Sequence, residues 1–186
     1  KVTDPKISLG YVMKAIEVTK QKLNDRVPLI GFAGAPWTLL CYMVQGKGTK
    51  TFDEAKSFLF TEKETSHKLL QMITDMTIAY LRAQIEAGAH TVQVFDSWAG
   101  ILSPADFREF SLPYIQQIVN GVKDLAPVIV FAKGAWFSLN ELSETGACGI
   151  GIDWCVEASF ARSQTGNSIT LQGNFDPAKL NAPIPV

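Results

Sequence analysis

The stretch Pro-Leu-Ile-Gly-Phe-Ala-Gly-Ala-Pro-Trp, residues 28–37, is more informative about the fold than any other part of the chain. Its apolar run, Leu29 to Phe32, predicts a buried strand that gives way to small residues at 33–36. Trp37 then starts a second apolar run, which contains Tyr42. Small residues after a strand allow a backbone or a ligand to approach closely. The turn is therefore either a tight strand-to-helix connection or a backbone cradle beneath a ligand.

Outward from this stretch, strand patterns alternate with helix patterns along the chain. Short apolar runs predict strands, and apolar residues spaced by three and four predict amphipathic helices. Successive strand–helix units favour parallel strands with right-handed crossovers, so the expected fold class is α/β. The expected strands are 27–32, 90–95, 128–131, 149–152 and 168–171. The expected helices are 9–23, 65–87, one capped by Ser103 and kinked at Pro113, a short one with capping-box spacing at 138–141 that ends at Gly146, and 157–163.

Polar residues follow several of the expected strands. Asp96 and Ser97 come after the second strand, Lys133 after the third and Asp153 after the fourth. The carboxyl ends of parallel strands meet at one edge of the sheet, where barrels and open doubly wound sheets both place their sites. No G-x-G-x-x-G or G-x-x-x-x-G-K-[ST] motif follows a strand, so a nucleotide site of either kind has weak support.

Lys133 is the most suggestive of these polar residues. A lysine that ends an apolar strand forms a Schiff base if burial lowers its pKa, or else pairs with Asp96, Asp153 or a substrate carboxylate. We favour ion pairing or neutralisation of a substrate carboxylate over covalent chemistry. Asp96 also fits a capping role, and Ser97 has no suitably placed histidine for a Ser/His/Asp nucleophile.

The histidines and cysteines give no pattern typical of a metal site. His67 is expected on the solvated face of a helix, and His90 opens a strand. Neither histidine has a second His or Cys at metal spacing, so no metal ligand is assigned. Three cysteines in apolar settings, Cys41, Cys148 and Cys155, are expected to be free, buried thiols in a reducing cytosol.

The composition is that of an ordinary globular protein. The 186 residues are 47% hydrophobic and 19% charged, and the formal net charge is −1. The absence of a Lys/Arg-rich tract argues against nucleic-acid and membrane-surface partners. No run approaches the roughly 20 apolar residues of a membrane-spanning helix. The sequence begins at Lys1 without an initiator Met, so we expect a fragment of a longer chain.

Five segments carry a further pattern: GFAGAPWTLLCYMVQG (31–46), VQVFDSWAGILSP (92–104), FAKG (131–134), GIDW (151–154) and LQGNFDP (171–177). In this order they resemble the uroporphyrinogen decarboxylase family. This resemblance implies a (β/α)8 TIM-type barrel, of which about five βα units are present. It further implies a cytoplasmic carboxy-lyase that removes the carboxyl groups from the four acetate side chains of uroporphyrinogen III. The product is coproporphyrinogen III, a haem precursor; the family uses neither metal nor organic cofactor, and the assembly it suggests is a homodimer.

The resemblance assigns substrate-binding roles to three residues and no catalytic role to any. Tyr42 matches the family's substrate-binding tyrosine, Ser97 its substrate-binding hydroxyl and Phe32 an aromatic of the pocket floor. The family's R-Q-A-G-R motif, its pyrrole-binding aspartate and its G-H-G histidine have no counterpart here. Residues 1–186 are therefore expected to form one domain, an incomplete barrel without its N-terminal strands and C-terminal strand. Further possible contacts are Lys133, Asp96 and Asp153.

Two other functions remain open from the sequence. A corrinoid or coenzyme M-type methyltransferase of the related barrel type would hold zinc with His and Cys at strand ends. The third strand instead ends in Ala132-Lys133, without a His-x-Cys pattern. The second alternative is a non-catalytic fragment that binds tetrapyrrole weakly or associates with other chains.

Overall fold

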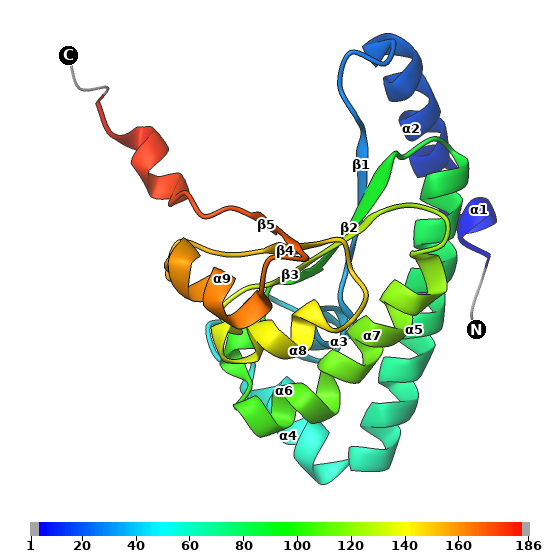
Figure 1. Ribbon diagram of the computed structural model, residues 1–186. Helices are drawn as coiled ribbons and strands as arrows, with labels where there is room; N and C mark the ends of the chain where they lie inside the picture. The colour runs from blue at the N-terminus through cyan, green and yellow to red at the C-terminus, as the bar shows by residue number, and fades with distance from the viewer. Residues whose placement is uncertain (1–3, 184–186) are drawn as a thin grey trace.

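Five parallel strands form a single sheet in chain order (Figure 1). The structure is a computed structural model that describes residues 4–183. Each strand pairs with the next one in the sequence, which is the arrangement that right-handed strand–helix–strand units produce. The prediction of an α/β fold is confirmed. The strands are β1 (Ile30–Gly34), β2 (Thr91–Asp96), β3 (Val128–Ala132), β4 (Gly149–Gly151) and β5 (Thr170–Gln172).

Helices connect the strands and cover one side of the sheet. Figure 1 shows α5, α7 and α8 along that side, whereas the segment after β5 runs away from the sheet. The helices are α1 (Pro5–Ser8), α2 (Gly10–Leu23), α3 (Pro36–Gln45), α4 (Asp53–Thr61), α5 (Lys63–Glu86), α6 (Pro104–Phe110), α7 (Leu112–Val122), α8 (Leu139–Ser143), α9 (Ala158–Thr165), and the short 3₁₀ turns η1 (Ala99–Ile101), η2 (Trp136–Ser138) and η3 (Pro177–Asn181).

The predicted strands are confirmed in number and order, with shifted ends. The first strand was expected at 27–32 but runs from Ile30 to Gly34. Pro28 cannot donate a backbone hydrogen bond to a ladder, which disfavours an earlier start. At the other end, pairing continues to Gly34, which lies opposite Phe95, and the Ala35 amide donates to the Phe95 carbonyl.

The expected kink at Pro113 is instead a break between two helices. Ser103 caps α6 as predicted, since its side chain accepts a hydrogen bond from the Asp106 amide. The helix then ends at Phe110, and α7 begins at Leu112 with Pro113 in its first turn. Proline favours the first turn of a helix because the amide it lacks there would have no intrahelical partner.

Two helices, α3 and α4, lie between the first expected strand and the expected 65–87 helix, where no helix bounds were predicted. The turn at 33–36 is tight, because Ala35 is the N-cap of α3 and Pro36 is its first residue. Leu39 packs so closely on Gly34 that a Cβ atom there would lie 2.9 Å from it. Ahead of α4, the fully buried Phe52 adopts a left-handed conformation with φ of 50°.

The two faces of the sheet differ in character. Val92, Val94, Val130 and Ile150 are fully buried on the helix side. On the open face, the Phe95 ring lies edge-on to Phe32 and Phe131, with both centroid distances 5.9 Å. These three rings form an aromatic row across β1, β2 and β3.

The outer edge of β1 is bonded by a side chain. The Gln84 amide nitrogen donates to the Phe32 carbonyl at 2.9 Å, and its oxygen accepts from the Phe32 amide at 3.0 Å. Gln84 lies on α5 and is almost fully buried. It thereby satisfies two backbone groups that a neighbouring strand would otherwise bond.

Candidate functional site

Of the three substrate-binding residues expected from the sequence, Phe32 lies on β1, Tyr42 on the helix after β1, and Ser97 directly after β2. Tyr42 lies on α3, directly after β1, and is 43% exposed. Its hydroxyl accepts a hydrogen bond of 2.9 Å from the indole Nε1 of Trp98, which follows β2. Its ring packs edge-on against Phe52 and Trp98, at centroid distances of 5.9 and 6.4 Å.

Tyr42 and Phe32 border the same apolar groove. The groove has a volume of about 580 Å³ and lies where β1, α3 and α5 meet. Phe32 is 63% exposed, so both side chains are accessible from the groove. Ser97, Lys133 and Asp153 are not among the residues that line it. The other lining residues are Pro5, Leu9, Ala33, Gly34, Leu39, Met43, Leu69, Met72, Ile73, Met76, Thr77 and Tyr80.

Asp96 is fully buried on the helix side of the sheet. Thr38 donates a hydrogen bond of 2.6 Å to Oδ1, and Ser111 donates one of 2.5 Å to Oδ2. Burial raises the pKa of Asp96 from 3.8 to about 6, although the hydrogen bonds of Ser111, Thr38 and the Trp98 backbone oppose this rise. Through these two hydrogen bonds, the Asp96 carboxyl connects α3 and the junction of α6 and α7 to the end of β2.

Lys133 contacts an aromatic ring rather than a carboxylate. Its Nζ atom lies 5.2 Å from the centroid of the Trp154 ring, within the range of a cation–π contact. Asp153 is engaged elsewhere, because its oxygens accept hydrogen bonds of 2.8 Å from the Gly134 and Cys155 amides. Within residues 4–183, Lys133 forms no ion pair, so the expected pairing with Asp96 or Asp153 is wrong.

Ser97 is half-buried and lies between Asp96, which is buried, and Trp98, which is half-buried. No hydrogen bond of its hydroxyl occurs within residues 4–183. It remains a predicted contact for substrate.

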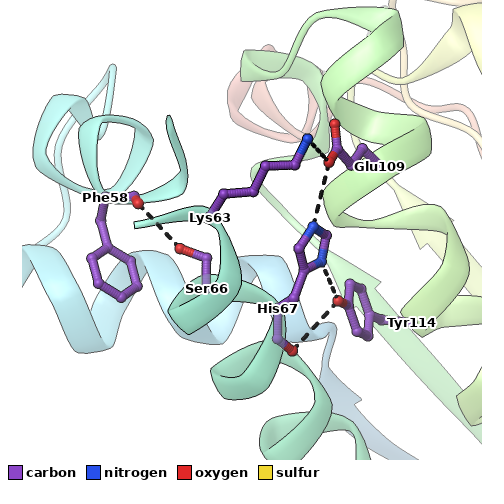
Figure 2. A network of polar contacts seen from close by, with 6 residues as sticks. All are labelled: Phe58, Lys63, Ser66, His67, Glu109 and Tyr114. Carbon is purple, nitrogen blue, oxygen red and sulfur yellow. Dashed lines mark hydrogen bonds and ion pairs between the residues drawn. The ribbon is translucent and has the colours of Figure 1, made fainter. Parts of the chain in front are cut away.

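A second polar cluster joins α5 to α6 and α7 (Figure 2). A hydrogen bond of 2.7 Å links His67 Nδ1 to the Tyr114 hydroxyl, and His67 Nε2 lies 3.3 Å from Glu109. The His67 ring stacks on Phe110 at 5.0 Å. The Lys63 ammonium holds the pKa of the Glu109 carboxyl below its usual range. His67 was expected on a solvated face, but α6 and α7 fold against that face and half-bury the ring.

Two of the three cysteines differ from expectation. All three are free, yet only Cys41 is buried, whereas Cys148 and Cys155 are exposed. Burial raises the pKa of the Cys41 thiol well above its usual range. Cys148 and Cys155 lie in loops on either side of the short β4.

The described residues provide neither a cluster of metal ligands nor a membrane-spanning helix. Residues 4–183 contain no group of three His, Cys, Asp or Glu side chains placed to hold a metal ion. No helix in the same range is both long enough and apolar enough to cross a bilayer.

The chain matches a known protein family along nearly its whole length. Residues 1–185 fit the family model described as uroporphyrinogen decarboxylase (URO-D). The chain belongs to the uroporphyrinogen decarboxylase family. The resemblance stated from the motifs is therefore confirmed, and it places this sheet among TIM-barrel-type folds.

Curated relatives named uroporphyrinogen decarboxylase are similar across most of the chain. The protein from Flavobacterium johnsoniae is 56% identical over 99% of this chain and 54% of its own length. The protein from Christiangramia forsetii is 57% identical over 96% of this chain and 52% of its own length. The protein from Schizosaccharomyces pombe is 52% identical over 93% of this chain and 51% of its own length. The chain thus spans about half the length of the curated relatives it matches.

A solved structure described as a methyltransferase from Methanosarcina mazei shares the fold. Its TM-score is 0.81 at 20% sequence identity, over 93% of this chain and 51% of the other. Identity at that level shows a common fold and carries no argument about activity.

Sequence reasoning missed the residues that hold Tyr42 in place. Trp98, Thr38 and Ser111 are hydrogen-bonded around Asp96 and Tyr42, although they are far apart in the sequence. A signal was present in Asp96-Ser97-Trp98, where a tryptophan directly follows two polar residues at a strand end.

Proposed function

We propose that the whole protein is a uroporphyrinogen decarboxylase. It removes the carboxyl groups from the four acetate side chains of uroporphyrinogen III and yields coproporphyrinogen III in haem biosynthesis. Support comes from the family match over residues 1–185 and from relatives of that name at 52–57% identity.

The observation that carries this proposal is the family match, together with the exposed side chains of Tyr42 and Phe32 beside β1. These are two of the three residues to which the family motifs assign substrate binding. A tyrosine hydroxyl can donate a hydrogen bond to a carboxylate, and such charge-assisted bonds are stronger than neutral ones. The exposed Phe32 ring offers an apolar surface for a pyrrole ring of the substrate.

Ser97 and Lys133 extend this proposed binding surface. Ser97 supplies a hydroxyl without a protein partner among the described residues, and Lys133 supplies a cation without an ion pair among them. Either group suits a substrate rich in carboxylates. For Asp96 and Asp153 we propose structural roles instead, because backbone amides and hydroxyls occupy their oxygens.

In this proposal, residues 1–186 bind and orient the substrate as one domain of an incomplete barrel. The groups that the family assigns to charge stabilisation, namely arginines, an aspartate and a histidine, belong to motifs outside these residues. We further propose a cytoplasmic protein, since three free cysteines fit a reducing compartment, and a homodimer as its assembly.

The test is turnover of uroporphyrinogen III by the whole protein under anaerobic conditions. Chromatography of the oxidised products should show successive loss of carboxyl groups, ending at the four-carboxylate porphyrin. Tyr42→Phe should lower kcat/KM by about ten- to a hundredfold, since a hydrogen bond to a charged group contributes roughly 1.5–3 kcal/mol. Its melting temperature should stay unchanged.

The matched control is Tyr11→Phe on α2, because Tyr11 is 72% exposed and does not line the groove. A wild-type protein that leaves uroporphyrinogen intact would refute the proposed function. Methyl transfer to a thiol by that protein would favour the methyltransferase alternative, and neither activity would favour a non-catalytic binding protein.

A further inference from the structure

Trp98 holds the hydroxyl of Tyr42 by a direct hydrogen bond. Its indole Nε1 donates to Tyr42 Oη at 2.9 Å, and the two rings are nearly perpendicular, at 78°. The bond joins the start of the loop after β2 to α3, across 56 positions of sequence. Neither the sequence patterns nor the family motifs assigned a role to Trp98.

The position of Trp98 is fixed by its neighbours. Its backbone amide donates to Thr38 Oγ1 at 3.2 Å, and its carbonyl accepts from Trp37 Nε1 at 3.0 Å. Its indole packs on the fully buried Phe52 ring with a centroid distance of 4.6 Å. Thr38 in turn donates to the buried Asp96. The indole is thus anchored to the core and cannot easily turn away from Tyr42.

The chemistry of the indole sets the direction of the hydrogen bond. A tryptophan N–H can only donate, so the Tyr42 oxygen must accept. The Tyr42 proton then remains available for another acceptor. Within residues 4–183 the Tyr42 hydroxyl forms no other hydrogen bond, and the side chain is 43% exposed beside the groove. Accepting one bond also strengthens the bond that the same hydroxyl donates.

We propose that Trp98 is a positioning residue for Tyr42, fixing its hydroxyl as a hydrogen-bond donor toward a carboxylate of the bound substrate. This inference rests on the proposed function. It predicts that the indole N–H, rather than the bulk of the ring, is the part of Trp98 that supports turnover.

The test compares variants of the whole protein in steady-state turnover of uroporphyrinogen III. Trp98→Phe keeps an aromatic ring against Phe52 and removes the N–H, whereas Trp98→His restores a ring N–H. Trp98→Phe should lower kcat/KM roughly three- to tenfold, as expected for one neutral hydrogen bond, and Trp98→His should recover part of the loss.

Combining the Trp98 and Tyr42 variants distinguishes a positioning role of Trp98 from a packing role. In a Tyr42→Phe background, Trp98→Phe should cause no further loss, because the acceptor of its N–H is already gone. A packing role predicts instead the same fold loss in both backgrounds, together with a lower melting temperature in each. That additive result, or wild-type turnover by Trp98→Phe, would overturn the inference.

Nuclear magnetic resonance tests the Trp98–Tyr42 hydrogen bond independently of the proposed function. The indole N–H resonance of Trp98, assigned from its loss in Trp98→Phe, should shift in Tyr42→Phe and stay in place in Tyr11→Phe. An unmoved resonance would overturn the hydrogen bond whatever the activity. A shifted resonance in a protein that does not turn over uroporphyrinogen would refute the proposed function and leave the Trp98–Tyr42 bond established.

Discussion

Replacing Asp96 with asparagine should remove a pH dependence of stability. The Asp96 carboxyl is fully buried, and its pKa is raised by burial from 3.8 to about 6. A difference of about two pKa units between the unfolded and native chain corresponds to about 3 kcal/mol, at roughly 1.4 kcal/mol per unit. Asparagine has nearly the same shape and does not titrate.

The sign of the effect follows from which state holds the proton. Below pH 3.8 the carboxyl is protonated in both states and contributes no pH dependence. Between 3.8 and about 6 the native protein keeps a proton that the unfolded chain has released, so stability falls as the pH rises. Above 6 both states are ionised, and the full cost of about 3 kcal/mol is present.

Urea unfolding of the whole protein between pH 4 and 8 measures this effect. The free energy of unfolding of Asp96→Asn, minus that of the wild type, should rise by up to about 3 kcal/mol across this range. Altered hydrogen bonds to Thr38 and Ser111 add an offset that does not vary with pH. The exposed Asp124→Asn is the matched control. Parallel pH curves for the wild type and Asp96→Asn would refute the electrostatic account.

Three further predictions concern metal, the core and the isolated chain. Dialysis against a chelator should leave turnover unchanged, because the family motifs imply metal-free chemistry; loss of activity that zinc restores would contradict this. Leu81→Ala on α5 should lower the free energy of unfolding by about 2–5 kcal/mol in urea titrations, because Leu81 is fully buried; a change near zero would show that the site is loosely packed. Residues 1–186 expressed alone should associate in size-exclusion chromatography and lack turnover, since β5 ends the sheet with unpaired backbone groups; an active monomer would contradict this.

The strands and the long helix were predictable because their patterns are local. Val128 to Phe131 is an uninterrupted apolar run, and such a run bounded by turn residues identifies a buried strand. The predicted 65–87 helix differs from α5 by only a few residues at its ends. The bounds of α3 and α4 were not predicted. Apolar residues nearly fill α3 and hide its helical period, and the start of α4 depends on the buried Phe52.

The candidate site was predictable only as far as motifs name individual residues. Tyr42 and Phe32 came from the motif around GFAGAPW, and the structure places both on one groove. The contacts of Trp98 with Tyr42 and of Asp96 with Ser111 depend on how distant helices pack, which no local pattern records. The exposure of His67 was misjudged for the same reason, since Glu109 and Tyr114 lie more than 40 positions away.

The Gln84 amide has a consequence for how the sheet can grow. The side-chain amide of Gln84 already bonds the backbone N–H and C=O of Phe32. An incoming strand must therefore displace this buried side chain to reach them. Extension at β1 is then an exchange of partners with little net gain in hydrogen bonds. No comparable side-chain amide bonds the backbone of Thr170, Leu171 or Gln172 within residues 4–183. The two ends of the sheet are therefore unequal, and uncontrolled strand addition should start from β5.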